Sequence, residues 1–209
     1  MLKSAGIGSL LGGGSSGPSI EDEVIVLTSR ANMTEAILKT GYQIETRQRQ
    51  GLKNVLLYGK DNPVNLLFPE QFLDTISKPI RIKLTLSNGT IQSAKIKSTL
   101  FETVTVKKQS LPCQIELPVG TIVNDSNTDI PISGEKSLAI RINPLQKTYE
   151  DLYEEFYAGA QETISDIILL IFENENKQRG YDFVNTIMTI YNQYSRDVKV
   201  KEASLNAKF

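Results

Sequence analysis

The 209-residue sequence has no histidine, no tryptophan and a single cysteine. Without histidine, the chain by itself cannot form a Ser-His-Asp triad, a Cys-His dyad or a histidine-ligated metal site. Cys113 cannot form an internal disulfide; beside alternating apolar residues it is either a small core residue or a reactive thiol. A glycoside hydrolase needs two carboxylates in a cleft that usually carries aromatic platforms, so the lack of tryptophan argues against one.

Long hydrophobic runs and an excess of one charge are absent as well. The longest apolar run, residues 166–172, has the length of a strand, whereas a membrane-spanning helix needs about 18 residues or more. The N-terminus lacks the basic segment and long apolar core of a secretory signal. Lysine and arginine number 23 against 24 acidic residues, so the net charge is −1 and no cationic excess indicates nucleic-acid binding. With 40% hydrophobic residues, the composition is that of a folded protein with a sizeable core.

A Gly/Ser-rich leader, residues 1–18, precedes a strong helix-start signal. The leader is interpreted as a flexible linker, because it lacks the Gly-Lys-Ser/Thr and the preceding strand of a phosphate-binding loop. Ser19 followed by Asp22 predicts a capping box. Residues 19–40 predict two consecutive helices or one kinked helix, with Asn32 as the cap of the second part. A rigid helix directly after a flexible leader indicates a domain held at a distance from another structure.

The middle of the chain is predicted to consist mostly of strands. Segments near 42–68 predict short strands. Apolar residues alternate from position 80 to position 86, before the Asn-Gly dipeptide at 88–89, and this pattern predicts a β-hairpin. Further alternating runs follow, so residues 79–143 predict an antiparallel β module inserted between the outer elements.

The last third of the sequence predicts helix, strand and helix. Residues 144–159 carry an apolar stripe at helical spacing, with Gly159 as the stop. The segment 162–173 is predicted to be a strand buried on both faces. Residues 177–209 carry a heptad-like apolar stripe without a cap before Phe209, so we expect this helix to continue toward a coiled coil.

Together these elements predict an α+β fold. The strands near 42–68 and 162–173 are expected to form a mixed sheet, covered by the helices 19–40, 144–159 and 177–209. The expected organisation is a linker, a discontinuous α/β base domain and an inserted β module, at residues 1–18, at 19–78 with 144–209, and at 79–143.

Charged residues form two groups with two interpretations each. The acidic run at 21–23 is either a site for a cation or a basic partner, or a solvated first turn that complements the helix dipole. The acidic residues between 150 and 155 are predicted to be the solvated side of their helix. Five basic residues on or beside predicted strands either contact an anionic polysaccharide or are ordinary exposed strand charges: Arg47, Arg49, Lys53, Lys107 and Lys108.

The order of these motifs resembles a known family. The segments "IEDEVIVLTSR" and "ANMTEAILKTGY", then "LLYGKDNPV", "LPVGTIV" and a strand-to-helix join at 140–145, occur in sequence before the closing "ISDIILLIFENENKQRGYDFVNTIMTIYNQY". This succession, which covers nearly the whole chain, is similar to the polysaccharide co-polymerase or chain-length determinant (Wzz-type) family. That family includes the periplasmic part of bacterial exopolysaccharide tyrosine autokinases, here in a Bacteroidetes-like branch.

The resemblance implies a periplasmic domain of an inner-membrane protein, with a membrane-proximal sheet and the leader as a linker from the membrane. The implied role is non-enzymatic, with no catalytic residue, cofactor or metal: oligomers regulate the chain length and export of capsular polysaccharide or exopolysaccharide. The implied partners are further copies of the chain, the polysaccharide polymerase, an outer-membrane export channel and the growing polysaccharide, but not nucleic acid. The family's two transmembrane helices and its cytosolic kinase do not occur in this sequence.

Within this interpretation, charge beside a rigid element makes Glu21, Glu23 and Arg30 the candidate oligomer contacts. Arg47, Arg49 and Lys53 are the candidate polysaccharide contacts. A domain without its membrane anchors loses their effective concentration, so we expect a monomer or weak oligomer in solution. The alternative interpretation is a periplasmic adaptor domain, similar to a membrane-fusion component, of an export machine; an enzyme ranks third.

Overall fold

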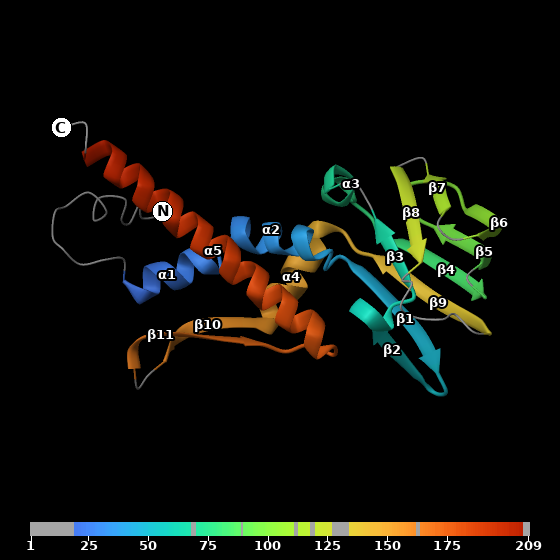
Figure 1. Ribbon diagram of the computed structural model, residues 1–209, viewed down its shortest axis with the longest axis horizontal. Helices are drawn as coiled ribbons and strands as arrows, with labels where there is room; N and C mark the ends of the chain where they lie inside the picture. The colour runs from blue at the N-terminus through green and yellow to red at the C-terminus, as the bar shows by residue number, and fades with distance from the viewer. Residues whose placement is uncertain are drawn as a thin grey trace.

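A computed structural model describes residues 19–67, 70–88, 90–110, 113–117, 120–126, 134–161 and 164–206. Figure 1 shows two lobes. The helical lobe contains α1 (Ile20–Leu27), α2 (Arg30–Thr40), α4 (Leu145–Glu155), α5 (Lys177–Asn206) and the strands β10 (Phe156–Gln161) and β11 (Ile164–Phe172). The β lobe contains β1 (Ile44–Gln50), β2 (Lys53–Leu57), η2 (Gly59–Asp61), β3 (Val64–Leu67), α3 (Glu70–Thr75), β4 (Ile80–Ser87), β5 (Thr90–Lys97), β6 (Val104–Ser110), β7 (Cys113–Leu117), β8 (Gly120–Ser126) and β9 (Glu135–Ile142). The α+β class is therefore confirmed.

The first two helices begin where local hydrogen bonds satisfy their backbone. The capping box of α1 is confirmed: the Ser19 hydroxyl accepts from the Asp22 amide at 3.2 Å, and the Asp22 carboxylate accepts from the Ser19 amide at 3.4 Å. The prediction of Asn32 as a cap is wrong. Ser29 caps α2, and Asn32 lies inside the helix, where its buried amide donates to the Val26 carbonyl at 2.6 Å. This hydrogen bond holds α2 against the end of α1.

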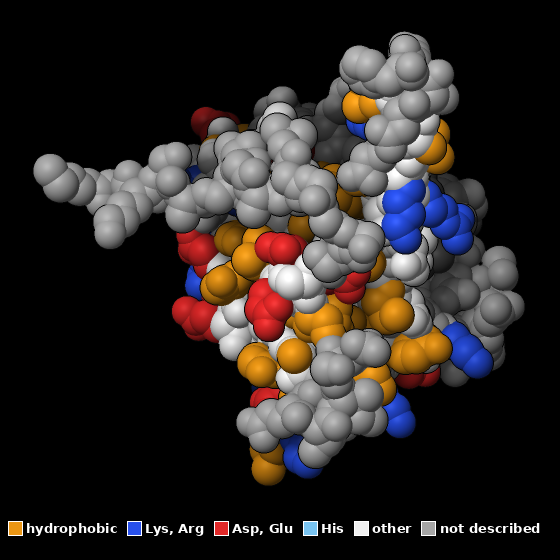
Figure 2. All heavy atoms as spheres, turned by 90° about the vertical axis from the view of Figure 1, so that its left-hand side faces the viewer, with side chains coloured by type: hydrophobic (Ala, Val, Ile, Leu, Met, Phe, Trp, Pro, Cys, Tyr) orange, Lys and Arg blue, Asp and Glu red, His pale blue; other side chains and the backbone are white. Residues whose placement is uncertain are grey.

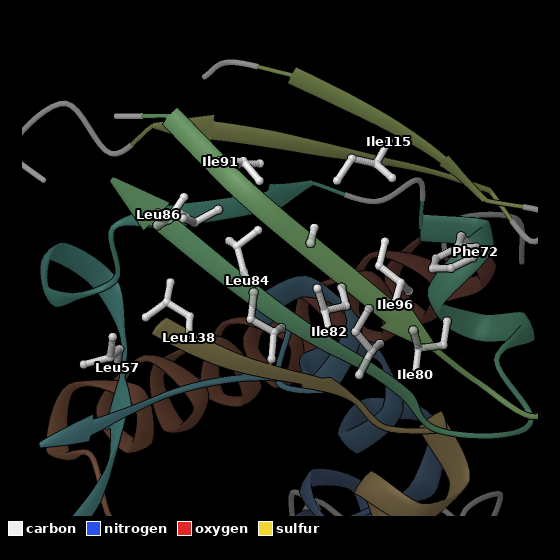
Figure 3. Packing of buried hydrophobic residues seen from close by; sticks show 14 of the residues in the cluster. Leu57, Phe72, Ile80, Ile82, Leu84, Leu86, Ile91, Ile96, Ile115 and Leu138 are labelled. Carbon is white, nitrogen blue, oxygen red and sulfur yellow. The ribbon is translucent and has the colours of Figure 1, made fainter. Parts of the chain in front are cut away.

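The β lobe packs a six-stranded sheet against a three-stranded one. The six-stranded sheet has the order β2-β1-β9-β4-β5-β6, and the three-stranded sheet has the order β3-β8-β7. The predicted hairpin is confirmed as β4 and β5. Its inward residues form the core, and Figure 3 shows them facing Ile115 of β7: Ile80, Ile82, Leu84 and Leu86 of β4, and Ile91, Ala94 and Ile96 of β5. Asn88, at the turn, has a positive φ of 48°, and Gly89 lies outside the described residues.

The mixed sheet expected from segments near 42–68 and 162–173 is not formed. All strand pairs between described residues are antiparallel; β1 pairs with β9, whereas β11 pairs only with β10. The strands β1 and β2 thus lie in the same sheet as strands of the predicted inserted module, and the sheet crosses the predicted boundary at 78/79.

The helix predicted over 144–159 ends earlier, at Glu155. Phe156 takes an extended conformation and starts β10, because the hairpin with β11 places it against Phe172 and Phe183. Gly159 is not a helix stop. It lies within β10, where the Tyr157 ring lies across it, and an added methyl group there would collide with that ring.

The helical lobe has its own core around the first half of α5. Met33, Ala36 and Ile37 of α2 pack with Phe183 and Ile187 of α5, and all five are fully buried. The rings of Tyr42, Phe156, Phe172 and Phe183 complete it, with centroids 5.2–6.2 Å apart. Among the described residues, no helix is long and apolar enough to cross a membrane.

Candidate functional site

Arg179, in the first turn of α5, joins the two lobes. Its side chain is only 5% exposed and lies over the Tyr42 ring, 3.8 Å from the centroid. The guanidinium donates to the carbonyls of Tyr42 at 2.5 Å and Ile44 at 3.5 Å, where β1 begins. No carboxylate of the described chain lies within ion-pair distance of it. Burial lowers the pKa of Arg179. The two carbonyls and the aromatic ring offset the cost of removing its charge from water.

Two more contacts connect the start of α5, and Glu175 just before it, to the β lobe. The Tyr58 hydroxyl donates to the Asp182 carboxylate at 3.0 Å, and Arg47 pairs with Glu175 at 2.9 Å. Burial and then the Asp182 hydrogen bond raise the pKa of Tyr58 to about 12. Burial also raises the pKa of Tyr42 to about 12, against the opposing effect of Arg179. Both phenols are therefore neutral structural groups near pH 7.

A cavity of about 470 Å³ lies beside this junction. Its acidic lining consists of Glu45, Asp151, Glu155, Glu173 and Glu175. Asn143, which is buried, also lines it, and the Asn143 Oδ1 atom has no hydrogen-bond partner among the described residues. Burial and the nearby Asp151 raise the pKa of Glu155, so the predicted solvated side of this helix in part lines the cavity. The described residues contain no group of three or more acidic or cysteine side chains suited to a metal ion.

The hairpin β10–β11 exposes an apolar outer face. One face, with Phe156, Leu170 and Phe172, packs into the helical lobe. On the other, Tyr157 lies opposite Ile171, and Gly159 lies opposite Leu169. The prediction that β11 is buried on both faces is therefore wrong: Ile167, Leu169 and Ile171 are 42–47% exposed. Both outer edges of this two-stranded sheet also lack a partner strand among the described residues.

The outer half of α5 carries exposed apolar residues as well. The stripe that buries Ile187 continues to Tyr194 and Leu205, which are exposed; Val200, on another side of the helix, is exposed as well. Figure 1 shows this half of the helix extending past the hairpin and α2. On the end face that carries α1, Figure 2 shows hydrophobic side chains beside carboxylates. The exposed Ile25 of α1 adds to the apolar surface of this lobe. We call the outer face of the hairpin, with Tyr157, Ile167, Leu169 and Ile171, the apolar surface.

The six-stranded sheet has an outer face of opposite character. On three adjacent central strands it exposes Arg81 and Lys83 of β4, Lys95 and Lys97 of β5, and Arg141 of β9. These five residues, which we call the basic face, line a shallow recess of about 550 Å³ that also includes Glu45 and Arg47. Since both residues also line the acidic cavity, the recess and the cavity adjoin along β1.

The predicted oligomer contacts lie on the helical lobe. Glu21 is exposed at the first turn of α1, whereas Glu23 is half-buried and contacts the Tyr191 hydroxyl of α5. Arg30 binds within the chain: it donates to Gln146 of α4 and lies over the Tyr149 ring at 5.4 Å. The structure therefore does not bring these three residues together as one exposed group.

The predicted polysaccharide contacts separate too. Arg47 lies at the junction and pairs with Glu45 and Glu175, while Arg49 donates to the Gly51 carbonyl at the β1–β2 turn. Lys53, in β2, lies directly opposite Gln50 of β1. Its side chain is therefore on the other face of the sheet from Arg49, which neighbours Gln50. Cys113 is half-buried against the β-lobe core, in agreement with the structural interpretation.

Sequence reasoning did not single out the basic face. The alternation of β4 and the Asn-Gly turn predict that Arg81, Lys83, Lys95 and Lys97 share one side of a hairpin, and this signal was available. Arg141 joins them only through the pairing of β4 with β9, which local patterns do not show. Neither a protein-family model nor a curated protein matches the chain.

Proposed function

We propose that this chain is the periplasmic domain of a polysaccharide co-polymerase of the inner membrane. Copies of it assemble and regulate the chain length and export of a capsular polysaccharide or exopolysaccharide. The observation that carries the proposal is the apolar surface, which belongs to a chain whose motif order resembles the Wzz-type family. The role is non-enzymatic, and the residues that form the surface act by contact between copies.

The apolar surface is of the kind that protein contacts cover. Scattered exposed hydrophobic residues need no explanation, but here Ile167, Leu169 and Ile171 lie in one row on one strand, with Tyr157 across from Ile171. An apolar face on a two-stranded sheet with open edges invites pairing with another chain. We assign a second copy as the occupant, since a ring needs a head-to-tail contact between two different surfaces of the same chain.

The acidic first turn of α1 stands at the rim of this lobe. Glu21 is exposed there and remains a proposed contact between copies, with Glu23 beside it. Arg30 supports the contact indirectly, because it fixes α2 against α4.

The test uses the full-length membrane protein with Leu169→Lys and Ile171→Lys. Leu52→Lys is the matched control, because Leu52 is 97% exposed on the β lobe, away from the apolar surface. We expect the hairpin variants to reduce oligomer size, measured by cross-linking in membranes, and to change polysaccharide length on gels. The control should behave like the wild type. Glu21→Lys with Glu23→Lys should disturb the oligomer less.

Unchanged oligomers and unchanged polysaccharide in both hairpin variants would contradict the proposal. Deletion of the gene separates it from the adaptor alternative. Altered or lost chain length supports the co-polymerase, whereas normal polysaccharide with failed export of small molecules or proteins supports the adaptor.

A further inference from the structure

We propose that the basic face of the six-stranded sheet binds an anionic polysaccharide through Arg81, Lys83, Lys95, Lys97 and Arg141. The inference deepens the proposed function and rests on it for the choice of a polysaccharide, because it names the chemical class of polymer that the domain contacts. The arrangement of charge on the sheet carries it.

The cations lie directly opposite one another. Arg81 is opposite Lys97 on one side and Arg141 on the other, and Lys83 is opposite Lys95. Like charges at directly opposed positions of a sheet destabilise it. Within the described ranges, none of the five has a carboxylate at ion-pair distance. Glu45 of β1 lies opposite Arg141 and offsets part of this repulsion. The pairs Arg81–Lys97 and Lys83–Lys95 have no carboxylate opposite them in the described strands, and an anionic ligand would relieve their repulsion.

Protection of sheet edges does not explain these charges. Lysines are common on edge strands, where they prevent pairing with other chains. The edges of this sheet are β2 and β6, whereas the basic face lies on the interior strands β9, β4 and β5. Solubility does not require the cluster either, since the chain as a whole has a net charge of −1.

The shape of the face fits an extended polymer. Neighbouring strands are about 4.8 Å apart, so a chain laid across the sheet meets Arg141, Arg81 and Lys97 in succession at roughly that spacing. A second row, Lys83 and Lys95, runs parallel to the first. A linear polymer with acidic groups on its sugars can place carboxylates on both rows.

Other polyanions fit the recess less well. Its lining contains no aromatic side chain, so unstacked bases of a single-stranded nucleic acid have no ring to stack on. The exposed large hydrophobic side chains of the described residues do not include any of β4, β5 or β9, so the face has no apolar anchor for a membrane.

The test is binding of the 209-residue protein to fluorescent polygalacturonate, with neutral dextran as the uncharged polymer. The patch variant combines Arg81→Gln, Lys83→Gln and Lys97→Gln. The control combines Arg196→Gln, Lys199→Gln and Lys201→Gln, which removes the same residue types from exposed positions of α5. We expect roughly tenfold weaker binding for the patch variant alone, since single exposed ion contacts are weak but add up, and weaker wild-type binding at high salt.

Circular dichroism checks the folding of both variants. The patch variant should melt no lower than the wild type, because it removes like-charge pairs. Equal binding by the patch and control variants would overturn the inference. Binding to phosphatidylglycerol vesicles or to a single-stranded oligonucleotide, but not to polygalacturonate, would overturn it as well.

Its failure is distinguishable from failure of the proposed function. If the hairpin variants alter chain length in cells while polygalacturonate binding does not depend on the patch, the inference falls and the proposed function stands. If binding depends on the patch while the hairpin variants leave chain length unchanged, the proposed function falls.

Discussion

The six-stranded sheet and the β10–β11 hairpin each have one buried face and one outer face. Each buries one face: the large sheet against β3 and β7, and the hairpin against the helical lobe. Their outer faces differ. The large sheet exposes lysines and arginines, whereas the hairpin exposes Ile167, Leu169 and Ile171.

This difference shows which of the two regions buries its apolar residues without help from another chain. A sheet with charged residues outside and apolar residues inside needs no further partner for stability. A hairpin that is apolar on both faces does, since a two-stranded sheet alone is marginally stable and its open face favours association. The hairpin is therefore the region that we propose to contact another protein surface, and the basic face is the region that we propose to bind a soluble ligand.

Truncating a leucine in each region should give the largest contrast. Leu84 of β4 is 1% exposed, and Leu169 of β11 is 44% exposed. We expect Leu84→Ala to lower the free energy of unfolding by about 2–5 kcal/mol, because it leaves a cavity in a closed core. Leu169→Ala should cost about 1 kcal/mol or less. Urea unfolding of the dilute protein measures both, and similar losses would break the comparison.

Arg179 joins the helical lobe to β1 of the large sheet, and its removal should have the second-largest effect. Arg179→Ala loses the ring contact and the carbonyl hydrogen bonds, so we expect a loss of about 2–3 kcal/mol in urea unfolding. Arg179→Lys should restore little of it, because an ammonium cannot stack and reach both carbonyls. Arg196→Ala, on the exposed part of the same helix, is the control. Equal stability of Arg179→Ala and this control would contradict the assigned role.

The hydrogen bond from Tyr58 to Asp182 should have the smallest effect, and it depends on pH. Tyr58→Phe should cost about 1 kcal/mol at pH 8. The pKa of Tyr58 is raised to about 12 in the folded protein, whereas an unfolded tyrosine titrates near about 10. Its contribution is therefore full below pH 10 and is lost as the pH rises toward 12. Urea unfolding at pH 8 and pH 11 should show the gap between wild type and variant closing; a constant gap would exclude this linkage.

Local patterns predicted the elements whose chemistry is local. Ser19 and Asp22 form the capping box because both partners lie within one turn. The alternation before Asn88 specifies a hairpin, since a period of two places every second side chain on one face. The apolar stripe of α5 predicted a long helix. It could not predict that Ile187 is buried and Leu205 exposed, because the stripe does not show where the elements that pack against the helix end.

The sequence by itself thus determined the α+β class, most strands and the long last helix, through spacing and caps within a few residues of each other. Only the tertiary structure decided that Ile44 lies opposite Ile142, that Phe156 leaves its helix to join a hairpin, and that Arg141 completes the basic face. These outcomes depend on contacts between residues far apart in the chain. There, burial and strand pairing outweigh the local preference of each segment.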